Sequence, residues 1–168
     1  MGVIHSDLKP GNVLVDAEER VYLSDFGLAR ALAGDFTPGA DYTPSAGTAP
    51  YMSPAVAAGE AEYTRSDIYG LGALLYEMLT GYPPYSGENT AQILEQIRAG
   101  PPRRIRDLNR EASPGLVMIA EGAMTRALRD RYSCMAGVVA DLDRVARQLP
   151  LLGPHSPKAK EVEFCPDL

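Results

Sequence analysis

Two short apolar runs joined by a polar turn constrain the fold of this chain most strongly. Residues 13–15 read V-L-V, residues 21–23 read V-Y-L, and the connection between them reads D-A-E-E-R. Apolar strand formers on both sides of a short polar connection are typical of a β-hairpin. We therefore expect an antiparallel pair that brings Asn12 and Asp25 to neighbouring strand ends at one edge.

The polar residues around this hairpin meet the chemical requirements of phosphoryl transfer from ATP. The chain reads H-S-D-L-K-P-G-N up to Asn12 and D-F-G from Asp25. Transfer of a terminal phosphoryl group needs Mg²⁺ on the phosphates, a carboxylate that orients the attacking hydroxyl, and a cation near the developing charge. Mg²⁺ prefers oxygen ligands and retains several waters, so Asn12 and Asp25 suffice as protein ligands. Asp7 is then the candidate base and Lys9 the candidate cation.

These motifs resemble those of eukaryotic-type serine/threonine protein kinases. Residues 5–12 resemble the catalytic loop H-R-D-L-K-P-x-N, and residues 25–27 resemble the metal-binding D-F-G. The stretch G-T-A-P-Y-M-S-P-A at residues 47–55 resembles the end of the family's activation segment, and S-D-I-Y-G-L-G at residues 66–72 resembles the start of its long central helix. Arg131 resembles the arginine that closes the lower lobe.

The resemblance implies an α+β fold that is predominantly α, namely the C-terminal lobe of a protein kinase with a small β-hairpin at the catalytic loop. We expect residues 1–148 to form this partial kinase domain. Residues 149–168 contain four prolines and little periodicity, which predicts a flexible C-terminal tail. Because only four residues precede His5, we also expect the chain to lack the N-terminal lobe and the helix that precedes the catalytic loop.

The resemblance also implies roles for the candidate site residues. Asp7 would be the catalytic base, and Lys9 would contact the transferring phosphate. Asn12 and Asp25 would bind Mg²⁺ and, through it, ATP, while Leu14 would lie under the adenine. Lysine at residue 9 accompanies serine or threonine acceptors in the family, so the expected substrate is a serine or threonine of a protein.

Further residues are expected to support this site. Thr48 would lie beside the catalytic base in the pocket for the acceptor residue. A histidine alone makes no metal cluster, so His5 is expected to pack behind Asp25 and Phe26. Asp67 is expected to act at a helix N-terminus and anchor the backbone of the catalytic loop. The supporting residues are therefore His5, Phe26, Gly27, Asp67 and Arg131.

Three departures from the family pattern bear on activity. Ser6 replaces the arginine that pairs with a phosphorylated activation loop, so we expect no such clamp. Ala55 replaces the glutamate that pairs with the arginine matched by Arg131, so we expect that charge to be unpaired unless Glu60 substitutes. Residues 49–50 read Ala-Pro in place of Pro-Ala, which moves the fixed φ and the missing backbone donor by one residue.

Apolar residues at helical spacing predict the long central helix. Ser66 is its expected N-cap, and Gly81 with the following prolines ends it. Its apolar stripe consists of Ile68, Leu71, Leu74, Leu75 and Met78. Without the preceding helix, part of this stripe should be exposed. It could then support self-association or bind a polypeptide that carries the N-terminal lobe.

Three more helices are predicted downstream of the central helix. A basic loop at residues 101–106 separates the first of them from the second. Pro114 is well placed at a first helical position, because it has no backbone N–H to leave unsatisfied. The expected starts of the three helices are Asn89 or Thr90, Ser113 and Ser133.

The composition argues against several classes of function. The net charge of −6 disfavours a nucleic-acid-binding surface, because phosphate backbones attract basic faces. No run reaches the roughly 20 apolar residues of a membrane span. Two cysteines fit a reducing compartment, so we expect a cytoplasmic protein that binds neither nucleic acid nor membrane.

Family membership and activity are separate questions, and three hypotheses remain open. The first is a serine/threonine kinase lobe whose N-terminal lobe is supplied elsewhere, which retention of all four polar site residues favours. The second is a non-catalytic, pseudokinase-like interaction module, and the third is a truncated inactive fragment. The expected absence of the N-terminal lobe favours the last two.

Overall fold

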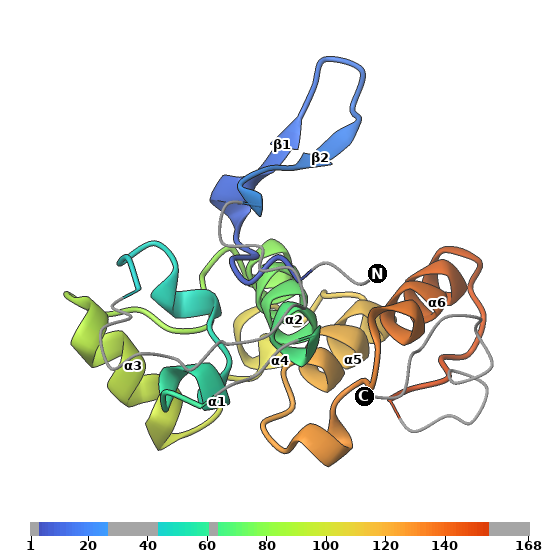
Figure 1. Cartoon of the computed structure of the whole chain (residues 1–168). Helices are drawn as coiled ribbons and strands as arrows, with labels where there is room; N and C mark the ends of the chain where they lie inside the picture. The colour runs from blue at the N-terminus through green and yellow to red at the C-terminus, as the bar shows by residue number, and fades with distance from the viewer. Residues whose placement is uncertain (1–3, 27–43, 61–63, 155–168) are drawn as a thin grey trace.

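The computed structural model describes residues 4–26, 44–60 and 64–154 (Figure 1). The described residues form one two-stranded antiparallel sheet and a predominantly helical body, which agrees with the predicted α+β class. The strands are β1 (Val13–Val15) and β2 (Val21–Leu23). The helices are α1 (Pro54–Ala57), α2 (Thr64–Thr80), α3 (Thr90–Ala99), α4 (Ile105–Leu108), α5 (Pro114–Ala123) and α6 (Met135–Ala146), with 3₁₀ turns η1 (Pro10–Asn12), η3 (Ala49–Tyr51) and η4 (Leu128–Asp130).

The predicted hairpin forms, and it projects away from the helices (Figure 1). Val13 pairs with Leu23, and Val15 pairs with Val21. In the connecting turn, the Asp16 carboxylate accepts hydrogen bonds from the backbone N–H and from Nε of Arg20, at 2.9 and 2.7 Å. The apolar side chains of both strands are largely exposed, because few helical residues reach this part of the chain.

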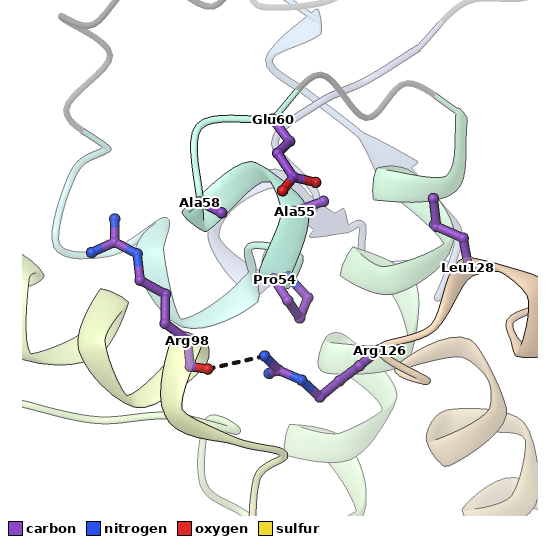
Figure 2. A pocket seen from close by; sticks show the side chains of 7 residues that line it. All are labelled: Pro54, Ala55, Ala58, Glu60, Arg98, Arg126 and Leu128. Carbon is purple, nitrogen blue, oxygen red and sulfur yellow. Dashed lines mark hydrogen bonds between the residues drawn. The ribbon is translucent and has the colours of Figure 1, made fainter.

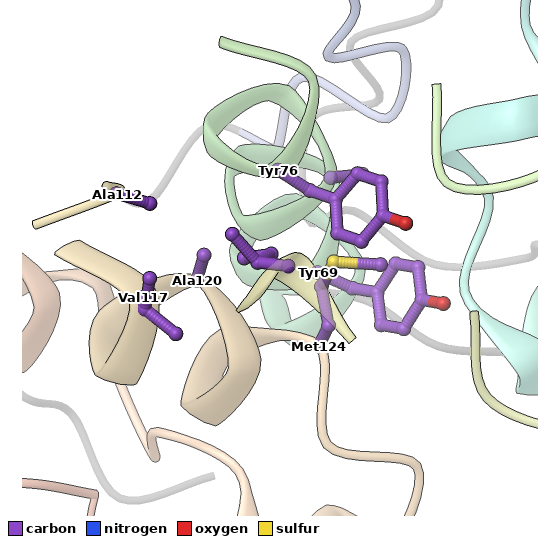
Figure 3. Packing of buried hydrophobic residues seen from close by; sticks show 8 residues of the cluster. Tyr69, Tyr76, Ala112, Val117, Ala120 and Met124 are labelled. Atoms are coloured by element: carbon purple, nitrogen blue, oxygen red, sulfur yellow. The ribbon is translucent and has the colours of Figure 1, made fainter. Parts of the chain in front are cut away.

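Helix α2 lies at the centre of the body and packs against α5 (Figure 3). Tyr69 and Tyr76 of α2 contact a buried cluster that includes Ala120 and Met124. Gly72 makes the close approach of the two helices possible. A Cβ atom at Gly72 would lie 2.8 Å from both Cβ of Ala123 and Cγ of Met124.

Replacing Gly72 with alanine is expected to lower the free energy of unfolding by about 1–3 kcal/mol, because the added methyl group overpacks the contact between α2 and α5. Urea denaturation of the purified chain measures this change. Gly100→Ala is the matched control, since a Cβ at Gly100 meets no atom within 4 Å and its φ of 176° suits any residue. Equal stability of both variants would contradict the packing described for Gly72.

Several predicted helix starts need correction. Thr64 is already helical, so Ser66 lies inside α2 and does not cap it. Cys134, and not Ser133, is the N-cap of α6. The predicted loop at residues 101–106 ends in the first residues of α4. The predicted start near residue 89 is confirmed, because the Asn89 side chain accepts a hydrogen bond from the Gln92 N–H at 3.0 Å.

Most side chains of the apolar stripe predicted for α2 pack against other helices of the body. Ile68 is buried among side chains of α5 and α6, and Leu71 and Leu75 pack against the same cluster. Met78 is the clearly exposed member, with 73% of its surface accessible. No helix within the described ranges is long and apolar enough to cross a membrane.

The first residues of the predicted tail pack on α6. The fully buried Asp141 accepts hydrogen bonds from the backbone N–H groups of Leu152 and Gly153, at 2.7 and 2.8 Å. It also accepts a hydrogen bond from the Tyr132 hydroxyl at 2.7 Å, and burial together with this bond raises the pKa of Tyr132. The chain is therefore held up to residue 154, while the rest of the predicted tail lies outside the described residues.

Candidate active site

The loop that carries the candidate base is anchored to the first turn of α2 by Asp67. The two carboxylate oxygens of Asp67 accept hydrogen bonds from the backbone N–H groups of His5 and Ser6, at 2.7 and 2.8 Å. Burial raises the pKa of Asp67, and the two donors act in the opposite direction. These bonds hold Ser6 at a φ of 66°, a conformation that non-glycine residues rarely adopt.

Gly70 lets this loop lie directly on α2. A Cβ atom at Gly70 would lie 2.9 Å from Cβ of Leu8 and 3.4 Å from its carbonyl oxygen. Any larger residue would therefore push the loop away from the helix. Gly70 was not among the expected site residues, although a glycine inside a helical pattern is a recognisable signal of close packing.

Four of the predicted site residues meet in one hydrogen-bonded cluster. Lys9 Nζ donates to Asp7 Oδ2 at 2.7 Å and to Thr48 Oγ1 at 2.9 Å. The Asn12 side-chain amide donates to the backbone oxygen of Asp7 at 2.7 Å and to its Oδ2 at 3.0 Å. Ser45, which was not assigned to the site, bonds to Thr48 Oγ1 at 3.0 Å. The cluster thus joins the loop before the hairpin to residues more than thirty positions away.

Among the described residues, none donates a hydrogen bond to one of the two carboxylate oxygens of Asp7. Oδ1 of Asp7 is buried and accepts no hydrogen bond, whereas Oδ2 accepts from both Lys9 and Asn12. A buried acceptor of this kind normally has a donor. The incoming hydroxyl of a substrate is a donor of suitable chemistry for this position.

Asn12 and Asp25 lie at neighbouring ends of the hairpin. Asn12 precedes β1, and its backbone oxygen accepts a hydrogen bond from the Ser24 N–H at 2.8 Å, next to Asp25. The backbone of Asp25 has a φ of 61°. Its side chain is exposed and makes no hydrogen bond or ion pair with any residue that the structure describes. An amide oxygen and a free carboxylate at one edge fit the oxygen ligands of a hydrated Mg²⁺ ion. Within the described ranges, no group of three or more His, Cys, Asp or Glu side chains forms an alternative metal site.

His5 lies behind the end of β2. Its Nε2 lies 2.8 Å from the Ser24 carbonyl oxygen, and its ring packs edge to face against Phe26 at a centroid distance of 4.8 Å. Phe26 itself is 49% exposed, and Leu14 on β1 is 52% exposed. Gly27, the last residue of the D-F-G motif, lies outside the described residues.

Arg131 is almost fully buried and packs against Tyr69 of α2. It donates hydrogen bonds to the carbonyl oxygens of Thr125 and Arg65, at 2.8 and 3.0 Å, and its guanidinium carbon lies 5.1 Å from the centroid of the Tyr69 ring. The expectation that Ala55 leaves Arg131 without a partner is therefore wrong. No ion pair joins Glu60 to Arg131 in the described part of the chain.

The fold and the loop geometry together define a class of protein: the chain belongs to the protein kinase domain family, whose profile matches residues 1–141. It is 37% identical over 159 residues to the serine/threonine-protein kinase PknB of Mycobacterium tuberculosis, covering 94% of this chain and 25% of that protein. It is also 37% identical over 157 residues to PknB of Mycobacterium leprae, with the same coverage. A probable serine/threonine-protein kinase of Corynebacterium efficiens, CE0033, is 35% identical over 150 residues, or 87% of this chain and 23% of that protein. The chain thus spans about a quarter of the length of these curated relatives.

Proposed function

We propose that this chain carries the catalytic centre of a serine/threonine protein kinase, in a segment equivalent to the C-terminal lobe. The buried cluster of Asp7, Lys9 and Asn12, with one oxygen of Asp7 left for a donor, is the observation that carries the proposal. The names of the relatives support a protein kinase. An N-terminal lobe, from the remainder of a longer protein or from another polypeptide, completes the nucleotide site.

Each residue of the cluster has a chemical task in this proposal. Asp7 orients the hydroxyl of the acceptor residue through Oδ1 and takes up its proton. Lys9 holds Oδ2 of Asp7 and offers positive charge to the transferring phosphoryl group. Thr48 closes the pocket around the acceptor residue, because its hydroxyl is fixed by Lys9 and Ser45.

Mg²⁺ and ATP are the cofactors of the proposed reaction. Asn12 and Asp25 would hold the ion, because the Asn12 amide N–H groups are already used by Asp7 and leave the amide oxygen as the ligand. Leu14 is exposed next to this edge and offers an apolar surface for the adenine. When bound, Mg²⁺·ATP supplies the phosphoryl group and neutralises charge on its oxygens.

Binding of Mg²⁺·ATP tests this assignment of ligands. At a nucleotide concentration 100-fold above Kd, we expect a rise in Tm of about 5–10 °C for a chain of this size. Asp25→Ala should abolish the shift, because it removes the exposed carboxylate. Glu18→Ala, in the hairpin turn and likewise exposed, should retain it. A shift that persists in Asp25→Ala, or without Mg²⁺, would reject the assignment.

A second candidate function is a non-catalytic interaction module. The observation that favours it is the exposed apolar surface of the hairpin, where Val15 and Val21 are 63% and 68% accessible. Exposed apolar surfaces of this kind often mark contacts with other proteins. Absence of any Mg²⁺·ATP stabilisation, together with tight binding of a partner through the hairpin, would favour this function over catalysis.

A further inference from the structure

A pocket of about 370 Å³ lies between α1, the C-terminal end of α3 and the turn after α5, and none of the catalytic cluster lines it (Figure 2). Pro54 and Ala58 contribute apolar walls. Arg98 and Arg126 contribute positive charge, while Glu60 lies on another side of the opening. The pocket therefore combines a small apolar surface with a net positive charge.

Arg126 is half-buried, and backbone carbonyl oxygens hold its guanidinium in place. Nη1 donates to the carbonyl oxygens of Ile97 and Gly100, and Nη2 donates to that of Arg98, as the dashed line in Figure 2 shows. An arginine has five N–H donors; these three bonds use three of them, and the Arg126 side chain also interacts with the Tyr85 hydroxyl. The guanidinium keeps its full charge, so a carboxylate that enters the pocket can form a charge-assisted hydrogen bond with it.

Within the described ranges, neither arginine of the pocket has a carboxylate partner. Arg98 donates from Nε and Nη2 to the same acceptor, the carbonyl oxygen of Ala57, at 2.9 and 2.6 Å. The ion pairs among the described residues include neither Arg98 nor Arg126, and Glu60 also forms none. Because carbonyl groups do not neutralise a full charge, the pocket retains two positive charges against one negative charge.

We propose that this pocket binds an acidic segment of the chain's own C-terminal region, residues 161–167. That segment reads E-V-E-F-C-P-D and carries three carboxylates around one phenylalanine. Its charge complements Arg98 and Arg126, and Phe164 suits the apolar wall beside them. The pairing would give Arg126 a carboxylate partner.

The anchored end of the chain lies beside α5, the helix that leads into the pocket. Residues 152–153 are fixed to Asp141, and Pro154 lies near Gly122, where an added Cβ would be 3.9 Å from its Cδ. Gly122 stands only four positions before Arg126. Seven residues of extended chain span up to roughly 23 Å, so residue 161 can lie up to that distance from Pro154.

Cysteine crosslinking in the full chain tests this docking. In a Cys134→Ser background, Cys165 is the remaining natural cysteine, and it belongs to the proposed segment. Ala58→Cys adds a thiol at the exposed wall of the pocket, and Ala146→Cys adds one on the exposed face of α6 as the matched control. Under a mild oxidant, we expect the intramolecular disulfide from position 58 to form about tenfold faster than that from position 146, because docking raises the effective concentration.

Charge variants decide whether electrostatic recognition causes the difference. Neutralising the segment with Glu161→Gln, Glu163→Gln and Asp167→Asn should reduce the rate at position 58 to that of the control, and Arg126→Gln should do the same. The segment variants lie outside the described fold, so they separate docking from misfolding. Equal crosslinking rates at the two positions, or rates that do not respond to these charges, would overturn the proposal. Disulfides that form only between two copies would also overturn it, because they would indicate a second copy as the occupant.

Discussion

Replacing Asp7 with asparagine is expected to lower the rate of phosphoryl transfer by about 10²–10⁴-fold, the typical contribution of a general base. Asparagine keeps the shape of the side chain but cannot take up the proton of the acceptor hydroxyl. Oδ2 of Asp7 also holds Lys9 at 2.7 Å, so the variant loses the ion pair that positions this cation. The measurement is the rate of phosphate transfer from Mg²⁺·ATP to a protein substrate, in the presence of the N-terminal lobe where this is a separate polypeptide.

The matched control for Asp7 is Asp16→Asn in the hairpin turn. Asp16 also forms a short bond to a basic side chain, at 2.7 Å from Arg20 Nε, but it lies at the far end of the hairpin. Its replacement should leave the transfer rate within about twofold, since it touches none of the catalytic cluster. An Asp7→Asn variant with the wild-type rate, or an equal loss in Asp16→Asn, would show that Asp7 is not the base.

Replacing Arg131 with methionine is expected to lower the free energy of unfolding by about 2–5 kcal/mol, because each buried acceptor left without a donor costs about 1–3 kcal/mol. Arg131 is 2% exposed, and its guanidinium donates hydrogen bonds to the carbonyl oxygens of Thr125 and Arg65. Methionine fills much of the volume but leaves these acceptors buried without a donor. Urea denaturation gives the change in stability.

Arg129 provides the control for this change. Its side chain is 88% exposed and its contact with Asp130 is long, at 3.6 Å. Arg129→Met should therefore change stability by less than about 0.5 kcal/mol, as surface substitutions usually do. A similarly small effect of Arg131→Met would mean that the buried guanidinium contributes little to the fold.

The hairpin was predictable because its signal is local. Strand formers and a polar turn fix the register within a few residues, so the proximity of Asn12 and Asp25 followed from spacing alone. Helix starts were less predictable. Ser66 and Ser133 are good capping residues, but α2 already includes Thr64 and α6 is capped by Cys134, because tertiary packing overrides a weak local preference.

The contacts that hold the candidate site together depend on the fold more than on local sequence. The motif indicated that Asp67 would anchor the catalytic loop, but the close contact of Gly70 with Leu8 required the position of α2. Arg131 was misjudged for a related reason. A missing glutamate can be read from the sequence, whereas backbone carbonyl acceptors such as that of Thr125 leave no sequence signal.

Transfer of labelled phosphate from Mg²⁺·ATP to protein is the most direct measurement of the proposed activity. The chain would be purified from the cells that express it, with any polypeptide that remains bound, and the labelled amino acid would be identified. We expect phosphoserine or phosphothreonine, formed only with Mg²⁺ and lost in Asp7→Asn and Asp25→Ala. If the wild-type chain incorporates no more labelled phosphate than the Asp7→Asn variant, or labels tyrosine alone, a serine/threonine kinase centre at residues 5–25 is contradicted.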